Sequence, residues 1–216
     1  INMFYRFSFI QKVIILLFSY SLIIAISVYL FKLSLYYNDT LSILTINLIQ
    51  GWNLVLIGFL FFQAFKNYRL SEKFYQKKKF ETPLFFKLLG VNFFRLFLIN
   101  SFFRHLNKRV YLRNRPKEYI PIYIEETKQS ETSHLFSMIC TFSIQIIYFK
   151  NELWEHVIWL SIFSILLNLY PILLQRMNRI KIRKKYPNYI EGFELLIETY
   201  YNNQERGQGT EILEEL

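Results

Sequence analysis

The stretch Val13–Phe31, VIILLFSYSLIIAISVYLF, contains no charged residue and lies between Lys12 and Lys32. A run of about 20 apolar residues is the length that an α-helix needs to cross the hydrocarbon core of a bilayer. The run follows basic residues, as in a signal peptide, but its apolar stretch is long and no small-residue cleavage site ends it. We therefore predict an uncleaved membrane-spanning helix.

Three further segments repeat this pattern. The second span is predicted at about residues 41–65, LSILTINLIQGWNLVLIGFLFFQAF, which again has no charged residue. The third and fourth spans are predicted at about 134–149 and 157–174, and the turn between them holds three charged residues. We expect an all-α, polytopic membrane protein in which residues 1–185 form a membrane domain with four transmembrane helices.

The composition also requires an apolar surrounding. Of the 216 residues 53% are hydrophobic, with 23 Phe and 16 Tyr, which is more apolar surface than a soluble chain of this length can bury. Only six Gly and five Pro are present, which argues against a turn-rich β fold. A net charge of +10 could indicate a nucleic-acid partner, but the basic residues occur in blocks that flank the apolar runs. Such blocks are typical of orientation signals in membrane proteins, so no nucleic acid is expected.

The distribution of basic residues predicts the orientation. Fourteen Lys and Arg lie within residues 66–117 and six more within 176–185, whereas the two predicted outer loops hold little besides Lys32 and Lys150. Cytoplasmic loops carry the excess of Lys and Arg, so both termini and the long central segment are expected in the cytoplasm. The predicted location is the cytoplasmic membrane, with four passes.

Two segments do not fit a simple span. Residues 83–103 are apolar but include Lys87 and Arg95, and cations are costly at the bilayer centre. This segment is predicted to be an interfacial or re-entrant helix with its cations at the headgroups. Residues 186–216 are acidic and have apolar residues at helical spacing. They predict a cytoplasmic amphipathic helix, which either packs on the basic face of this protein or docks a partner.

The densest polar group in the chain runs from Glu125 to His134, at the start of the third span. Before it, Pro116 and Pro121 indicate irregular or extended structure. A helix that begins within the polar group places three of its residues on one face: Lys128, Glu131 and His134. A carboxylate one turn from an imidazole can hold its tautomer and raise its basicity, so Glu131 and His134 are candidate catalytic residues.

The fourth span carries a second set of candidates at its polar end. With the predicted orientation, the start of the third span and the end of the fourth lie on the same side of the membrane. Arginine forks suit phosphate or carboxylate groups, and the alternative is that Arg176 and Arg179 are ordinary anchors of a positive-inside helix end. The candidate substrate-binding residues are Lys128, Asn168, Gln175, Arg176, Asn178 and Arg179.

Metal and cofactor chemistry have no motif in this sequence. Glu131-x-x-His134 is half of a di-iron motif, which needs a second copy that the sequence lacks. No phosphate-binding loop, dinucleotide-binding pattern or Gly-x-Ser-x-Gly motif is present. We expect neither a metal nor a cofactor.

The same polar residues resemble a known family. Glu126-Thr127-Lys128 through Glu131 and His134, followed by Asn168-x-x-Pro171 and Gln175-Arg176-Met177-Asn178-Arg179, resemble the glycosyl-4,4'-diaponeurosporenoate acyltransferases. The resemblance is confined mainly to residues 85–182. It departs from the family pattern at Ser130, where Ala is expected, at Leu135, where an aromatic residue is expected, and at Met177, where Tyr is expected.

The resemblance implies a small integral membrane protein of bacteria that transfers a fatty acyl group to a hydroxyl of a glycosylated lipid or carotenoid. His134 would be the general base and Glu131 would orient it, while Arg176 and Arg179 would hold the anionic part of an acyl-carrier or phospholipid donor. Asn168 and Gln175 would bond the acceptor or the oxyanion. The alternative is a non-catalytic small membrane subunit that docks in a larger complex. A transporter is disfavoured because no inverted repeat is visible.

Overall fold

The computed structural model describes residues 9–64, 70–101 and 119–187, and every regular element in these ranges is a helix. The elements are α1 (Phe9–Ser34), α2 (Thr40–Ala64), α3 (Glu72–Tyr75), α4 (Pro83–Leu88), α5 (Val91–Asn100), α7 (Ile120–Lys150), α8 (Trp154–Ser164), the π-helix η4 (Ile165–Leu169) and α9 (Tyr170–Lys185). The last three follow one another without a break and form one long fourth helix. The predicted all-α fold is confirmed.

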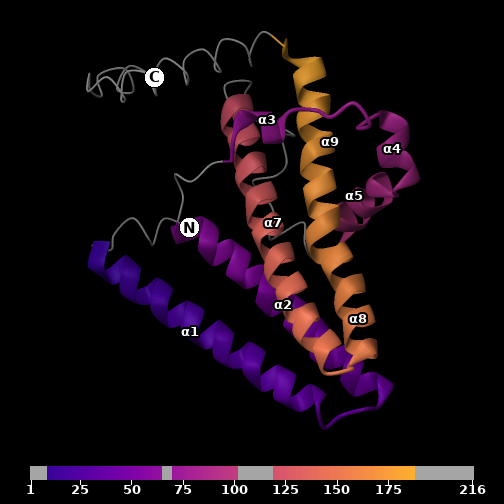
Figure 1. Ribbon diagram of the computed structural model, residues 1–216. Coiled ribbons are helices and arrows are strands. Elements are labelled where there is room, and N and C mark those ends of the chain that lie inside the picture. Colours follow the sequence, from indigo (N-terminus) through magenta and orange to yellow (C-terminus); the bar gives the residue numbers. More distant parts are fainter. Residues whose placement is uncertain (1–8, 65–69, 102–118, 188–216) are drawn as a thin grey trace.

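Four of the described helices are long and apolar enough to cross a membrane. The candidate spans lie within α1, α2, α7 and the continuous α8–η4–α9 helix. In Figure 1, α7 and the fourth helix run side by side, α2 packs against both, and α1 diverges from the others while contacting α2. The predicted count of four spans is confirmed for the part of the chain that the structure describes.

Two of these helices extend beyond the predicted spans. The third helix, α7, begins at Ile120, ahead of the span predicted at about 134–149, and the fourth continues to Lys185, past the span predicted at about 157–174. Pro121, which indicated irregular structure, lies in the first turn of α7. Proline is tolerated there because the first N–H groups of a helix have no intrahelical acceptor. The polar half of α7 is therefore helical and buried against α9, since Tyr123 and Ile124 pack with Ile182.

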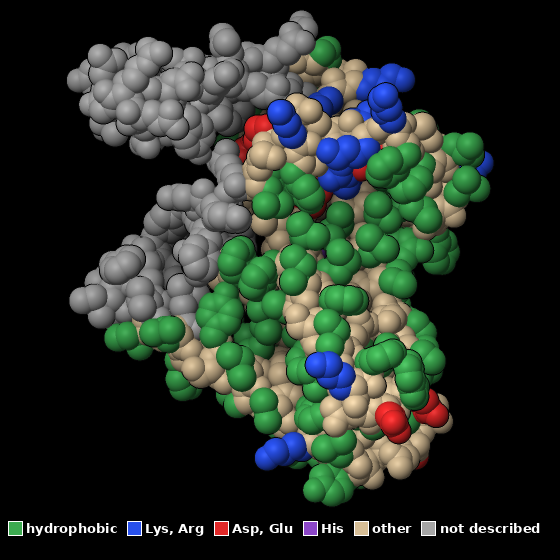
Figure 2. Space-filling view, viewed as in Figure 1, with side chains coloured by type: hydrophobic (Ala, Val, Ile, Leu, Met, Phe, Trp, Pro, Cys, Tyr) green, Lys and Arg blue, Asp and Glu red, His purple; other side chains and the backbone are tan. Residues whose placement is uncertain are grey.

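The charges on the long helices mark two boundaries. Between Glu131 and Lys150 of α7, and between Glu155 and Arg176 of the fourth helix, no Asp, Glu, Lys or Arg occurs. At 1.5 Å per residue, the first interval is about 28 Å long. That length is close to the roughly 30 Å thickness of a hydrocarbon core. Glu131 and Arg176, which border these intervals and bind each other, therefore lie near one edge of the apolar band. Figure 2 shows charged side chains gathered at the two ends of the molecule.

Residues 83–103, predicted to be one interfacial or re-entrant helix, include two short helices instead. Gly90, between α4 and α5, has a left-handed backbone with φ of 69°, which glycine adopts at little cost. Both helices pack on α9, where Phe86 and Val91 form a buried cluster with Leu174 and Met177. The predicted C-terminal amphipathic helix lies outside the described residues, because the description ends at residue 187.

Amide side chains join α2 to its neighbours inside the apolar band. Gln50 and Asn53 both donate to the hydroxyl oxygen of Ser27 in α1, at 3.1 and 2.8 Å. Asn47 lies 2.8 Å from Nδ1 of His156 in α8. Because lipid tails are as apolar as leucine, helices in a bilayer are held together by such hydrogen bonds and by close packing.

Candidate functional site

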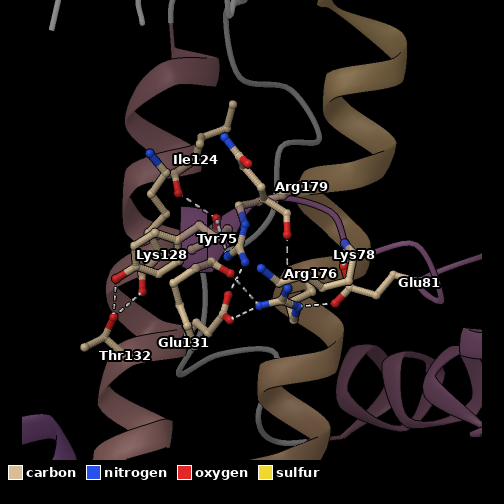
Figure 3. A network of polar contacts seen from close by, with 12 residues as sticks. Tyr75, Lys78, Glu81, Ile124, Lys128, Glu131, Thr132, Arg176 and Arg179 are labelled. Carbon is tan, nitrogen blue, oxygen red and sulfur yellow. Dashed lines mark hydrogen bonds and ion pairs between the residues drawn. The ribbon is translucent and has the colours of Figure 1, made fainter. Parts of the chain in front are cut away.

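Glu131 lies at the centre of a cluster of buried charges between α7 and α9 (Figure 3). Its side chain is completely buried, and each carboxylate oxygen binds a different arginine. Oε1 accepts a hydrogen bond of 2.6 Å from Nη1 of Arg176, and Oε2 accepts one from Nη2 of Arg179. The two arginines are three residues apart, so they project from the same face of α9 toward α7.

The segment that includes α3 closes the other side of this cluster. Arg176 donates through Nε to Glu81, a carboxylate that is itself only 2% exposed. The same guanidinium also donates to the backbone carbonyls of Phe74, at 3.3 Å, and Gln76, at 3.2 Å. Arg176 thus joins three parts of the chain: α7 through Glu131, α9 through its own backbone, and residues 74–81 through the remaining contacts.

Tyr75 and Lys128 extend the cluster toward the start of α7. The Tyr75 hydroxyl lies 2.5 Å from the Thr132 hydroxyl, and its ring lies 5.6 Å below the Arg179 guanidinium carbon. Burial raises the pKa of Tyr75 above its usual value. The Lys128 ammonium forms ion pairs with Glu72 at 2.9 Å and with Glu125 at 2.8 Å. This predicted substrate-binding lysine is therefore already paired within the chain.

Each charged side chain in this cluster has a partner of opposite charge. Lys128, Arg176 and Arg179 face four carboxylates, and burying any of them without a partner would be costly. Buried polar atoms without a hydrogen-bond partner among the described residues include Nε of Arg179 and Oε1 of Gln175. The cluster can therefore fix α7, α9 and residues 72–81 relative to one another, and these two atoms are among its available hydrogen-bonding positions.

His134 lies one turn further into the apolar band and has a different partner from the one expected. The sequence paired it with Glu131, but both oxygens of Glu131 bind arginines. Instead, Nδ1 of His134 lies 3.4 Å from Oδ1 of Asn168, and the ring also interacts with the backbone of Leu167. When Oδ1 of Asn168 accepts a hydrogen bond from Nδ1–H, the neutral imidazole carries its available lone pair on Nε2. Asn168 rather than Glu131 is thus placed to select the tautomer.

A distortion of the fourth helix presents Asn168 to His134. Asn168 is 1% exposed and lies in the π-helix η4. The N–H of Tyr170, the residue after η4, donates to the carbonyl of Ile165, five residues earlier. Pro171 has no N–H to donate to the carbonyl of Leu167, four residues earlier, so a regular α-helix is interrupted here. Single π turns within α-helices occur frequently at functional sites.

The remaining candidates lie on either side of these two groups. Asn178 is half-buried and donates to the Tyr123 hydroxyl at 3.3 Å, while Gln175 is buried beside Arg176. The structure thus brings Lys128, Glu131, Arg176 and Arg179 into one network and His134 and Asn168 into a neighbouring pair. Among the described residues, no group of three or more His, Cys, Asp or Glu is arranged to hold a metal ion.

Sequence reasoning missed the contribution of residues 72–81. Glu72 and Glu81 are the two acidic residues in the basic stretch 66–117, and the structure pairs one with Lys128 and the other with Arg176. The available signal was the presence of isolated carboxylates within a block of basic residues. Tyr75 had no distinguishing pattern, because it is one of 16 tyrosines in the chain.

Residues 71–186, more than half of the chain, match the family described as glycosyl-4,4'-diaponeurosporenoate acyltransferase. The chain belongs to this family. The match with this acyltransferase family begins one residue before α3 and ends one residue after α9. It therefore contains both halves of the charged cluster and the His134–Asn168 pair, whereas α1 and α2 lie outside it. No curated protein and no solved structure matches the chain.

Proposed function

We propose that this protein is a membrane-embedded acyltransferase that transfers a fatty acyl group to a hydroxyl of a glycosylated lipid or carotenoid at the cytoplasmic face. The acyltransferase family and the four apolar helices support the general class. The observation that carries the proposal is the His134–Asn168 pair, since it places a partly buried imidazole beside an amide that can fix its tautomer, just inside the edge of the apolar band.

In the proposed reaction, Nε2 of His134 accepts the proton of the acceptor hydroxyl as that oxygen attacks the acyl carbonyl of the donor. A new ester bond forms and the bond between the acyl carbon and the donor's thiol or hydroxyl breaks. The imidazolium then returns the proton to the departing sulfur or oxygen. The donor is an acyl carrier or a phospholipid, and the reaction requires no oxidant or reductant.

The charged cluster has a positioning role in this proposal. Glu131 holds α7 against α9. His134 lies in α7, and Asn168 lies in η4, which leads directly into α9. Direct binding of the donor's anionic group by Arg176 and Arg179 stays a prediction, because both guanidinium groups already bind carboxylates. Substrate contacts by Lys128, Gln175 and Asn178 also stay predictions. The unpartnered Nε of Arg179 and Oε1 of Gln175 are the atoms best placed for them.

The proposal is tested by replacing His134 with alanine in the full chain. Removal of a general base typically lowers the rate by about 10²–10⁴-fold, so acylated glycolipid or carotenoid glycoside should almost disappear. Asn168→Ala should lower the rate less, because the imidazole stays in place and only the hydrogen bond that fixes its tautomer and orientation is lost. The measurement is mass spectrometry of lipids and pigments from cells in which each variant replaces the original protein.

The matched control is His156→Gln, which changes the other described histidine within the spans. It should retain acylation when product is normalised to inserted protein, because His156 contacts Asn47 near the opposite edge of the apolar band. An unchanged lipid and pigment profile in His134→Ala would contradict the catalytic role. It would favour the alternative, a non-catalytic membrane subunit.

A further inference from the structure

The α4–α5 hairpin has an exposed apolar face that the proposed reaction does not use. Val91 of α5 is completely buried against α9, whereas Phe93, Leu96 and Phe97 on the opposite side of the helix are 77%, 56% and 52% exposed. Leu84 and Leu88 of α4 are also largely exposed. Figure 2 shows hydrophobic side chains gathered where Figure 1 places α4 and α5. An exposed apolar patch of this kind marks an interaction surface.

Two cations lie along the edge of this hairpin where it meets α9. Arg95 of α5 and Lys181 of α9 are both exposed, and their chain neighbours Phe94 and Ile180 pack on the same buried cluster. Neither forms an ion pair with a carboxylate in the described part of the chain. Two adjacent cations without a carboxylate between them provide a site for one phosphate group.

The level of the hairpin along α9 identifies the partner. α5 packs on Tyr170 and Leu174, which precede Arg176, the first charged residue after the apolar band of the fourth helix. The apolar face therefore lies at the edge of the hydrocarbon region, whereas Lys181, which follows Arg176 by five residues on α9, lies beyond it. This vertical order, apolar chains first and phosphate next, is that of a phospholipid in a bilayer leaflet.

We propose that the α4–α5 hairpin binds an anionic phospholipid of the surrounding leaflet, with its phosphate between Arg95 and Lys181 and its acyl chains along Phe93, Leu96 and Phe97. This surface does not depend on the proposed acyl transfer, and it holds whether or not the chain is an enzyme. A helix that lies in the interface with basic residues at the headgroups and aromatic residues below them binds the membrane in two ways. It buries apolar surface and it attracts anionic headgroups.

The position of the apolar face is tested with spin labels on the full chain in phosphatidylglycerol vesicles. Cys140→Ser removes the single cysteine. A nitroxide is then placed at Phe93→Cys or, as the matched control, at Lys79→Cys, an exposed position in the segment after α3. The label at 93 should collide with oxygen and be shielded from a water-soluble nickel chelate, and the label at 79 should behave in the opposite way. Equal accessibility of both labels to the nickel chelate would overturn the proposal.

The phosphate site is tested by the double variant Arg95→Gln/Lys181→Gln. Each cation near an anionic surface is worth about 1 kcal/mol, so two should change the preference for phosphatidylglycerol over phosphatidylcholine by roughly tenfold or more. Lipid retained by the purified protein in mixed micelles is counted by mass spectrometry. The control, Lys184→Gln/Lys185→Gln, removes the same charge from the end of α9 and should change the preference much less. Equal losses in the two double variants would show that only total charge matters and would overturn the site.

Discussion

The two ends of the helical bundle are joined by different kinds of polar contact. At one end, α7 and α9 are held by ion pairs from Glu131 to Arg176 and Arg179. Toward the other end, α2 and α8 are joined by a neutral hydrogen bond between Asn47 and His156. Both contacts are buried and both connect helices that are far apart in the sequence, yet only the first uses charge.

The difference follows from depth in the membrane and from the number of partners. The charged cluster lies at the edge of the apolar band, where residues 72–81 cover it with Glu81 and with backbone carbonyls. The amides lie within the spans, where an ionised side chain would be costly and a neutral one can be buried with fewer partners. The comparison indicates that the ionic end fixes a particular arrangement, while the neutral end adds modest cohesion.

The largest expected effect comes from Glu131→Gln. This change leaves Arg176 and Arg179 close together without their shared carboxylate, and breaking a buried ion pair typically costs about 3–5 kcal/mol. The free energy of unfolding, measured by denaturant titration in detergent micelles, should fall by that amount. Adding Arg179→Met should recover part of the loss, because it removes one of the uncompensated cations.

The control for Glu131 is Glu155→Gln, an exposed carboxylate at the opposite end. Its effect should stay within about 0.5 kcal/mol, as for most surface substitutions. Equal small effects of the two changes would remove the distinction between an ionic, structure-fixing end and a neutral one.

An intermediate effect is expected where α2 crosses α7, between the two ends. A Cβ added at Gly58 would overlap the backbone carbonyl of Ser133, which cannot rotate away, whereas one added at Gly51 would meet only the side chains of Phe163 and Leu167 at 3.3 Å. Gly58→Ala should therefore destabilise by about 1–3 kcal/mol through overpacking. Gly51→Ala should cost less in the same denaturant titration, and the reverse order would contradict the close crossing at Gly58.

The smallest expected effect is at the neutral end. A double-mutant cycle with Asn47→Leu and His156→Leu should give a coupling energy of about 0.6 kcal/mol, the average for hydrogen bonds between membrane helices. The corresponding cycle for Glu131 and Arg176 should give a coupling several times larger. Couplings of equal size would show that burial, rather than charge, sets the strength of both contacts.

The residues of the third and fourth spans show how far the sequence could predict the site. It predicted that His134 and the Arg176/Arg179 pair lie on one side of the membrane. In the structure they lie at the same end of the bundle, because Glu131, one turn before His134 in α7, binds both arginines. It did not predict that Asn168 would be the partner of His134, because that contact depends on a π turn next to Pro171. Nor did it predict Glu81, since a contact between residues 81 and 176 has no local signature.

By itself, the sequence determined the helical class, the four spans and the polar residues at their ends. These features depend on the hydrophobicity and helical spacing of neighbouring residues, which are local and can be counted along the chain. Only the tertiary structure decided which charge binds which. Several cations and carboxylates were available, and the packing of α7 against α9 under residues 72–81 selected Glu131 and Glu81 as the partners of Arg176. The physical reason is that a buried charge must find its partner among whatever the fold brings within reach.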